Sequence, residues 1–277
     1  MSLNPYQNLI QYLDPSLEMS AEQKASCAVL LRMARSKDPQ EAALKLSALK
    51  HLDISGFPES KKVTMDAQFI SFLPELTEIN VNYQPLNDYS PLFKKENLKV
   101  LHCKGLNLGN ANEWTALKFL ETLILDENNI DSIEPLSTLH NLKILSLNRN
   151  KLNQLKGIEE LKNLEDLSFG ENHISNLKPL ENLFGLKKLF AAKNMIEELS
   201  SLQKLKKLSA VNLAENSISN VLPLEDLREI AFLNLRYNRI RSVKPLRDLA
   251  NLRELSLLGN PVDEEDFDLF PRSLKID

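Results

Sequence analysis

The sequence is poor in glycine and cysteine, and these shortages exclude several kinds of site. None of its seven glycines has the spacing of a Walker or Rossmann phosphate-binding loop. The two cysteines, Cys27 and Cys103, lie in apolar stretches, and neither has a second ligand at metal-binding spacing. We therefore expect two buried thiols that act as small hydrophobic side chains, and we expect no metal or cofactor.

Long apolar runs are also missing. No stretch approaches the roughly 18 apolar residues of a membrane-spanning helix, and the first residues do not form a basic segment followed by an apolar one. The net charge of −4 comes without a basic cluster, which argues against nucleic acid as a partner. We expect a cytoplasmic protein, or one delivered into a host cell if it is a bacterial effector. The oligomeric state stays open, with a monomer preferred.

Catalytic constellations are absent as well. The four histidines do not group, because His51 and His102 fall on predicted strands two turns apart, and His140 and His173 fall on loops. No nucleophile elbow and no cysteine–histidine arrangement is present. The sequence therefore predicts that the protein is not an enzyme and has no catalytic residues.

Leucine, in contrast, is abundant and regularly spaced. The pattern L-x-x-L-x-L-x-x-N-x-L recurs every 22 residues. Such a repeat predicts a solenoid, because each turn buries its apolar residues only against the neighbouring turns. The first positions of the pattern are Leu98, Leu120, Leu142, Leu164, Leu186, Leu208, Ile230 and Leu252.

The second half of each turn carries apolar residues at three-residue spacing, as at Ile130, Ile133, Leu136 and Leu139. That spacing favours a short 3₁₀ or irregular segment on the convex side rather than an α-helix. The strands are then expected to form a parallel sheet on the concave side of a right-handed solenoid of the α/β class.

A buried asparagine is expected at the bend after each strand. The bend leaves backbone N–H and C=O groups without strand partners, and an amide side chain can both donate and accept. We predict this structural ladder at Asn128, Asn150, Asn172, Asn194, Asn216, Asn238 and Asn260.

The complete frame L-x-x-L-x-x-L-x-L-x-x-N-x-I-x-x-I-x-P-L-x-x-L resembles that of 22-residue leucine-rich-repeat proteins. These include the bacterial internalins and the leucine-rich regulatory subunit of protein phosphatase 1. The resemblance covers residues 98–262 closely and residues 49–97 loosely. It implies a leucine-rich-repeat fold, and the last residues resemble the C-terminal cap of intracellular members, with a shorter helix.

Residues 1–48 lack the repeat and carry three helix-start signals, at Asn4, Ser20 and Asp38. We predict a helical N-terminal cap over residues 1–48, a solenoid of about ten repeats over residues 49–262, and a C-terminal cap over residues 263–277. The N-terminal helices are interpreted as a plug on the open end of the solenoid. The alternative is an enzyme or an independent functional module in this region.

Residues 22 apart become neighbours on the sheet, so columns of the sequence predict its surface. Two columns alternate in charge, which predicts cross-strand ion pairs. They run through Lys99, Glu121, Lys143, Glu165 and Lys187, and through Glu127, Arg149, Glu171, Lys193 and Glu215.

Two further columns contain apolar residues where polar ones are expected. Clusters of this kind, rimmed by charge, are typical of a partner site; the alternative is that the apolar rows pack on one another. We predict a protein or peptide partner on the concave face, with the protein acting as a scaffold, regulatory subunit or effector. The predicted partner-binding residues are Val100, Ile124, Ile144, Phe190, Phe232, Arg236 and Tyr237.

Overall fold

The computed structural model describes residues 3–56, 63–109, 112–271 and 273–277. The chain divides into two compact units. The first unit contains residues 1–106 and 112–123, and the second contains residues 107–111 and 124–277. Their boundary lies within the predicted solenoid, and the expected division into cap, solenoid and C-terminal cap stays a prediction.

The first unit begins with three helices. Asn4 and Ser20 each accept the N–H of the residue three positions later, and the side chains of Gln7 and Gln23 reach back to complete two capping boxes. The three helix starts therefore agree with the signals in the sequence. The helices are α1 (Pro5–Leu13), α2 (Ala21–Ala34) and α3 (Pro39–Ser47).

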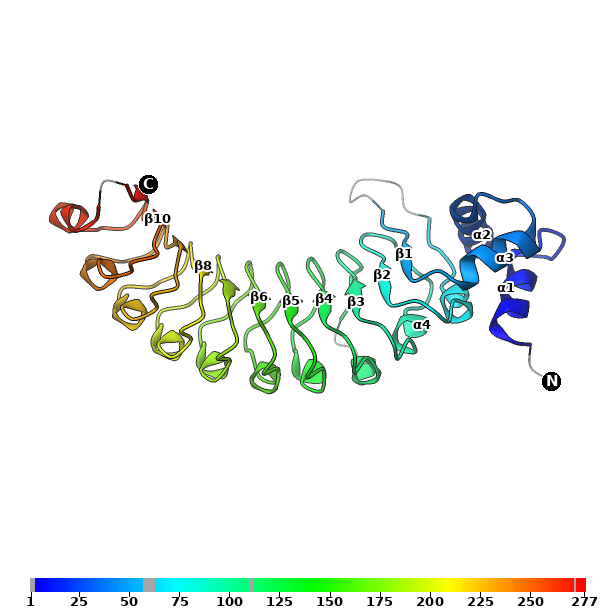
Figure 1. Cartoon of the computed structure of the whole chain (residues 1–277), viewed down its shortest axis with the longest axis horizontal. Coiled ribbons are helices and arrows are strands. Elements are labelled where there is room, and N and C mark those ends of the chain that lie inside the picture. Colours follow the sequence, from blue (N-terminus) through cyan, green and yellow to red (C-terminus); the bar gives the residue numbers. More distant parts are fainter. Residues whose placement is uncertain (1–2, 57–62, 110–111, 272) are drawn as a thin grey trace. The chain divides into compact units, whose positions relative to one another are not determined.

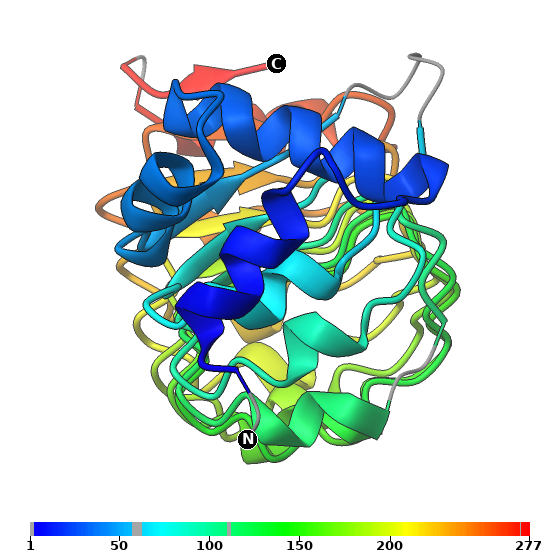
Figure 2. The same cartoon turned by 90° about the vertical axis from the view of Figure 1, so that its right-hand side faces the viewer.

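A buried aspartate attaches these helices to the first turns of the same unit. The Asp66 carboxylate accepts hydrogen bonds from Tyr12 Oη at 2.7 Å and from Asn87 Nδ2 at 3.1 Å, and the Asp66 carbonyl accepts from Ser26 Oγ at 2.9 Å. The pKa of the Tyr12 phenol is raised, mainly by burial and secondly by the hydrogen bond to Asp66. The Tyr12 ring also meets the Phe72 ring edge-on at 5.8 Å. These contacts suit a plug, and Figure 2 shows α1 to α3 lying over the first turns of their own unit.

Short parallel strands follow, one in each turn. In the first unit, His51 lies level with Glu78, and Glu78 lies level with Val100. The strands are β1 (His51–Asp53), β2 (Glu78–Asn80) and β3 (Val100–His102), and a four-residue helix, α4 (Ser90–Phe93), stands between the last two.

Strand β4 (Thr122–Ile124) contains the boundary between the units. The second unit continues the coil with parallel strands paired in the order of the sequence. Its 3₁₀ turns lie on the outer side of the unit's curve and its strands on the inner side (Figure 1). The strands are β5 (Ile144–Ser146), β6 (Asp166–Ser168), β7 (Lys188–Phe190), β8 (Ala210–Asn212), β9 (Phe232–Asn234), β10 (Glu254–Ser256) and β11 (Lys275–Ile276).

Short 3₁₀ turns form the opposite side of the coil. Proline occupies the first or second position of several of them, where no backbone N–H is needed. Three early turns differ in length from the later ones, because α4 is a short α-helix and residues 68–72 and 112–116 form longer 3₁₀ turns. The three-residue turns of the second unit are Glu134–Leu136, Ile158–Glu160, Lys178–Leu180, Ser200–Leu202, Leu222–Leu224 and Lys244–Leu246.

Asparagine side chains bridge successive bends of the second unit. Asn172 Oδ1 accepts the N–H of Leu152 at 3.0 Å, and its Nδ2 donates to the carbonyls of Leu147 and Phe169, both at 2.9 Å. The same pattern recurs at each predicted position from Asn150 to Asn260. The amide side chain therefore provides hydrogen-bond partners for the backbone N–H and C=O groups that the bend leaves without strand partners.

The second unit ends in a turn held by a buried acid. Asp266 is 1% exposed within the 3₁₀ segment Glu264–Leu269. Its Oδ2 accepts from Ser242 Oγ at 2.7 Å and from the Val243 N–H at 2.8 Å, and Lys244 Nζ lies 3.5 Å from Oδ1. Burial alone would raise the pKa of Asp266, but these donors outweigh it and lower the pKa.

Removing one amide of the ladder should destabilise the protein. Asn172→Ala leaves the Leu152 N–H and two carbonyls without their partner, so we expect unfolding free energy to fall by about 3 kcal/mol in urea denaturation. Asn153 is exposed, and Asn153→Ala should change it by less than about 0.5 kcal/mol. Equal effects of the two substitutions would contradict a structural role for the ladder.

The Asp266 carboxylate should make stability depend on pH. Because its folded pKa is lowered, its contribution is present above the unfolded pKa near 3.8 and is lost as pH falls through the folded pKa. Asp266→Asn should therefore lower the melting temperature at neutral pH, and the difference from wild type should shrink below about pH 4. Asp268→Asn, at an exposed neighbour, should leave the profile unchanged. A pH-independent deficit in Asp266→Asn would exclude this account.

Candidate functional site

The outward side chains of the strands form a regular grid, which we call the strand face of the second unit. Side chains alternate along each strand, so Lys188 and Phe190 of β7 point outward while Leu189 is buried. The register places Lys188 level with Ala210 and Phe190 level with Asn212. Two outward positions per strand thus become two rows across the strands.

The predicted partner-binding residues fall into separate places. Val100 is half-buried in β3 of the first unit, whereas Ile124 and Ile144 belong to the second. The bond from the Leu125 N–H to the Ser146 carbonyl places the end of β4 beside the end of β5. Ile124 therefore lies level with Ser146 rather than with Ile144, and the two isoleucines are diagonal neighbours.

One half of the strand face is a connected polar network. Asp126 Oδ1 accepts from Ser146 Oγ at 2.6 Å and from the Asn148 N–H at 2.8 Å. Asn148 Oδ1 in turn accepts the N–H of Gly170 at 2.6 Å. An added Cβ at Gly170 would lie 3.1 Å from that oxygen, so the close approach favours glycine. These groups already satisfy one another, which leaves few donors or acceptors for a partner.

The other half is an apolar surface, which we call the apolar patch. Phe190 lies level with Asn212, Phe232 lies level with Ala210 and Glu254, and both rings are half-buried. Leu258 extends the patch and is 51% exposed. The patch contains Phe190, Ala192, Ala210, Ala214, Phe232 and Leu258.

Arg236 and Tyr237 border this patch. Arg236 Nη2 lies 2.6 Å from Asp277 Oδ2, while its Nε is buried without a hydrogen bond to any described residue. Tyr237 is 54% exposed and has a left-handed φ of 54°. Its ring lies against the backbone of Gly259, because a Cβ on that glycine would stand 2.4 Å from Tyr237 Cδ1. The Tyr237 ring is therefore exposed to solvent on one side and supported by the Gly259 backbone on the other.

Sequence reasoning missed two features of this area. The residue before each ladder asparagine has a positive φ, as in Glu127, Arg149 and Tyr237. Only one member of that column in the second unit is glycine, the residue that favours positive φ, so the amino-acid types do not reveal the left-handed backbone there. Leu258 was also missed, although its column, which continues from Ala214 and Arg236, predicts an outward side chain.

Ion pairs cross several strands at the edges of the grid. Arg149 contacts Glu127 at 2.9 Å and Glu171 at 3.0 Å, and Lys187 contacts Glu165 at 2.7 Å. In the first unit, Lys99 lies 3.8 Å from Glu121. These pairs agree with the alternating columns of the sequence. Exposed pairs of this kind contribute about 0–1 kcal/mol each, so they set the surface charge more than the stability.

Three buried or half-buried titratable side chains outside the strand face, Cys27, Cys103 and Lys95, have shifted pKa values. Burial raises the pKa of the Cys27 thiol to about 11 and also raises that of Cys103, so both are poor nucleophiles. Burial lowers the pKa of Lys95 to about 8, but its Nζ donates to the Leu73 carbonyl at 2.8 Å. Among the described residues, no three histidine, cysteine or acidic side chains group as metal ligands. In the same residues, no helix is long and apolar enough to cross a membrane.

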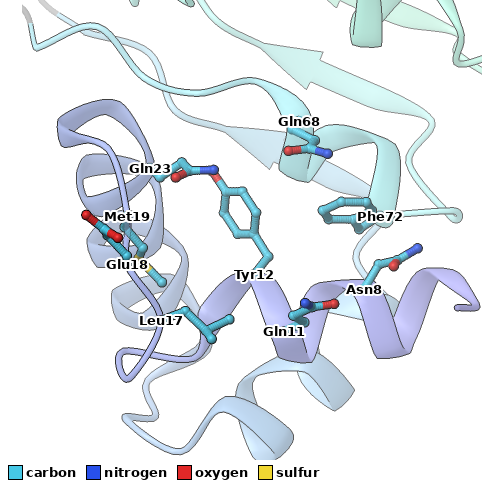
Figure 3. A pocket seen from close by; sticks show the side chains of 9 residues that line it. All are labelled: Asn8, Gln11, Tyr12, Leu17, Glu18, Met19, Gln23, Gln68 and Phe72. Carbon is cyan, nitrogen blue, oxygen red and sulfur yellow. The ribbon is translucent and has the colours of Figure 1, made fainter.

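A pocket of about 270 Å³ lies among the N-terminal helices (Figure 3). Tyr12 and Phe72 project toward it, and amide side chains such as Gln11 and Gln68 surround them. The lining holds one carboxylate, Glu18, and neither histidine nor cysteine.

The support of Tyr237 by Gly259 can be tested by adding one methyl group. Gly259→Ala should lower the unfolding free energy by about 1–3 kcal/mol, because alanine is strained at φ +80° and its Cβ meets the Tyr237 ring. In a Tyr237→Ala background the steric part disappears, so the same substitution should cost less. Gly109→Ala, where a Cβ meets nothing within 4 Å, is the matched control. Equal costs in both backgrounds would show that the ring does not rest on Gly259.

Among known proteins, only solved structures resemble this chain. Neither a protein-family model nor a curated protein matches the chain. Internalin C2 from Listeria monocytogenes is 27% identical, with a TM-score of 0.68 over 82% of this chain and 94% of that one. A leucine-rich-repeat protein of Leptospira interrogans is 26% identical, with a TM-score of 0.73 over 84% of this chain and 61% of that one.

Two more distant structures are ligand complexes and share the fold alone. The plant peptide hormone receptor RGFR1 in complex with RGF2 is 19% identical, with a TM-score of 0.63 over 82% of this chain and 43% of that one. The TLR13–ssRNA13 complex is 24% identical, with a TM-score of 0.63 over 83% of this chain and 36% of that one. The repeats, the parallel strands and these likenesses together identify the chain as a leucine-rich-repeat protein with internalin-like repeats.

Proposed function

We propose that the protein is a non-enzymatic binding module whose apolar patch, with Arg236 and Tyr237 at its border, receives a protein or peptide partner. The observation that carries this proposal is the contrast between the two halves of the strand face. One half is hydrogen-bonded within itself, and the other exposes aromatic and aliphatic side chains on a sheet whose edges are ion-paired.

The chemistry of the patch suits anchor residues of a protein partner. Phenylalanine, tyrosine and arginine are enriched among residues that dominate binding energy. Burying an aromatic ring such as Phe190 or Phe232 contributes about 2 kcal/mol, and Ala210 beside Phe232 leaves room for a partner side chain. Tyr237 adds a ring whose orientation is fixed before binding, which reduces the entropy lost on association.

The fold supports a binding role without naming the partner. RGFR1, which shares the fold, is a peptide receptor in its complex, whereas TLR13 holds single-stranded RNA in its own. For this chain, we favour protein over RNA, because the strand-face rows alternate in charge and RNA requires a continuous basic track. A cytoplasmic role as scaffold or regulatory subunit, or delivery into a host cell as an effector, is compatible with this proposal.

Charge placed on the two rings should abolish partner binding. In Phe190→Asp/Phe232→Asp, a partner would have to bury two carboxylates in place of two rings, and we expect affinity to fall about a thousandfold. The measurement is capture from nuclease-treated lysates, using a photo-crosslinking residue at Asn212, in the middle of the patch. Wild type should yield a cross-linked protein that the double variant does not.

Phe184→Asp is the matched control, because Phe184 is 52% exposed and lies outside the strands of the same unit. It should retain the cross-linked protein, which separates loss of the site from added negative charge. A band that persists in the double variant would place the binding site elsewhere. Capture that requires intact RNA would instead favour the nucleic-acid alternative.

A further inference from the structure

Helix α2 ends beside an open groove of about 750 Å³ that belongs to neither the strand face nor the pocket of Figure 3. Apolar side chains from the loop after α1 and from α2 form its walls, and basic side chains surround it. The lining comprises Pro15, Ala28, Leu31, Arg32, Arg35, Ser36 and Lys37. An apolar surface rimmed by charge of one sign favours an amphipathic ligand of the opposite sign.

The basic side chains of this groove have no acidic partner among the described residues. Arg32, Arg35 and Lys37 enter none of the ion pairs, whereas many lysines and arginines of the sheet are paired. Arg35 also holds the left-handed position that ends α2, with φ 51°. Glycine is favoured at such a position, so arginine there is maintained at a conformational cost.

The last turn of the second unit has the complementary chemistry. In the 3₁₀ segment Glu264–Leu269, Phe267 is 39% exposed and Leu269 is 38% exposed. Three acidic side chains accompany them in exposed positions, and none of the three forms an ion pair within the described residues. They are Glu264, Glu265 and Asp268.

The buried Asp266 fixes how this segment is presented. Its bonds to Ser242 and Val243 hold the turn against the second unit, while its neighbours face solvent. In a 3₁₀ helix, residues three apart lie on the same side, so Glu264 stands beside Phe267 and Glu265 beside Asp268. The chain thus carries an acidic, apolar turn in one unit and a basic, apolar groove in the other.

We propose that the groove at the end of α2 binds the acidic turn at residues 263–270 of a second copy of the chain, so that copies associate head to tail. Phe267 and Leu269 would occupy the space beside Leu31, and the acids would face Arg32, Arg35 and Lys37. The interface is heterologous: each copy offers one groove and one turn, so copies can join into closed rings or open chains.

Such an interface is small, and its attraction comes largely from exposed charges. Interfaces of this size are transient, and charge pairs at their rim are screened by salt. We therefore expect the average mass in sedimentation velocity to rise above the 31.5 kDa of one chain as concentration increases at low salt. At about 0.5 M salt it should return toward the monomer value, because the screening length falls to a few ångströms.

A mixing experiment tests the pairing of these two surfaces. The groove variant Arg32→Glu/Arg35→Glu keeps a normal turn, and the turn variant Phe267→Ser/Leu269→Ser keeps a normal groove. Each alone should remain monomeric at concentrations where wild type associates. Mixed, they should form one species with the mass of two chains and nothing larger, because one functional groove and one functional turn remain.

Dimer formation in the mixture also shows that both variants are folded, since a misfolded variant could not supply its intact surface. Leu44→Ser, at a residue of α3 that is 65% exposed, is the control and should associate like wild type. A wild-type chain that stays monomeric at every concentration in low salt would overturn the proposal. So would self-association that persists in either variant, or two folded variants that fail to pair.

Discussion

The buried asparagine amide at the end of each strand is the interaction on which every turn of the second unit depends. A bend inside a solenoid leaves N–H and C=O groups without strand partners, and each one left unsatisfied costs about 1–3 kcal/mol. Asn172 meets Leu152 and Leu147 of the preceding turn as well as Phe169 of its own. Because one amide must reach both turns, inserting a residue would break these bonds, which accounts for the constant 22-residue period.

The constant period is also what creates a strand face with separate regions. Residues one period apart become lateral neighbours, so Asp126 accepts the Asn148 N–H and Lys188 reaches Asp166 without any long-range coincidence. The polar half is closed by its own hydrogen bonds, and the ion pairs supply charge of both signs. Ile144 of β5 is 38% exposed within the polar half, whereas Phe190, Phe232 and Leu258 belong to the apolar patch. The strand face therefore has one region whose polar groups hydrogen-bond to each other and another region whose apolar side chains a partner can bury favourably.

Periodicity explains which parts of this structure the sequence could predict. The ladder asparagines, the ion-paired columns and the outward position of Phe190 all follow from counting residues, because register alone decides them. The left-handed residue before each asparagine does not, since Glu127 and Arg149 carry no compositional sign of it. Asp266 is one acid among several, and only folding shows which is buried. The groove at α2 arises where non-repeating helices pack, so no column of the sequence describes it.

Partner binding and head-to-tail association would use different residues, so each could occur without preventing the other. The apolar patch draws on β7 to β9 and on Leu258 after β10, whereas the proposed contact between copies uses α2 and the turn at residues 263–270. An assembly of copies would then offer several identical patches. A partner with more than one anchor segment would bind such an assembly more tightly than a single copy, because the second contact is effectively intramolecular. A weak contact between copies can in this way increase affinity for a partner without altering the patch, and salt would weaken that increase first.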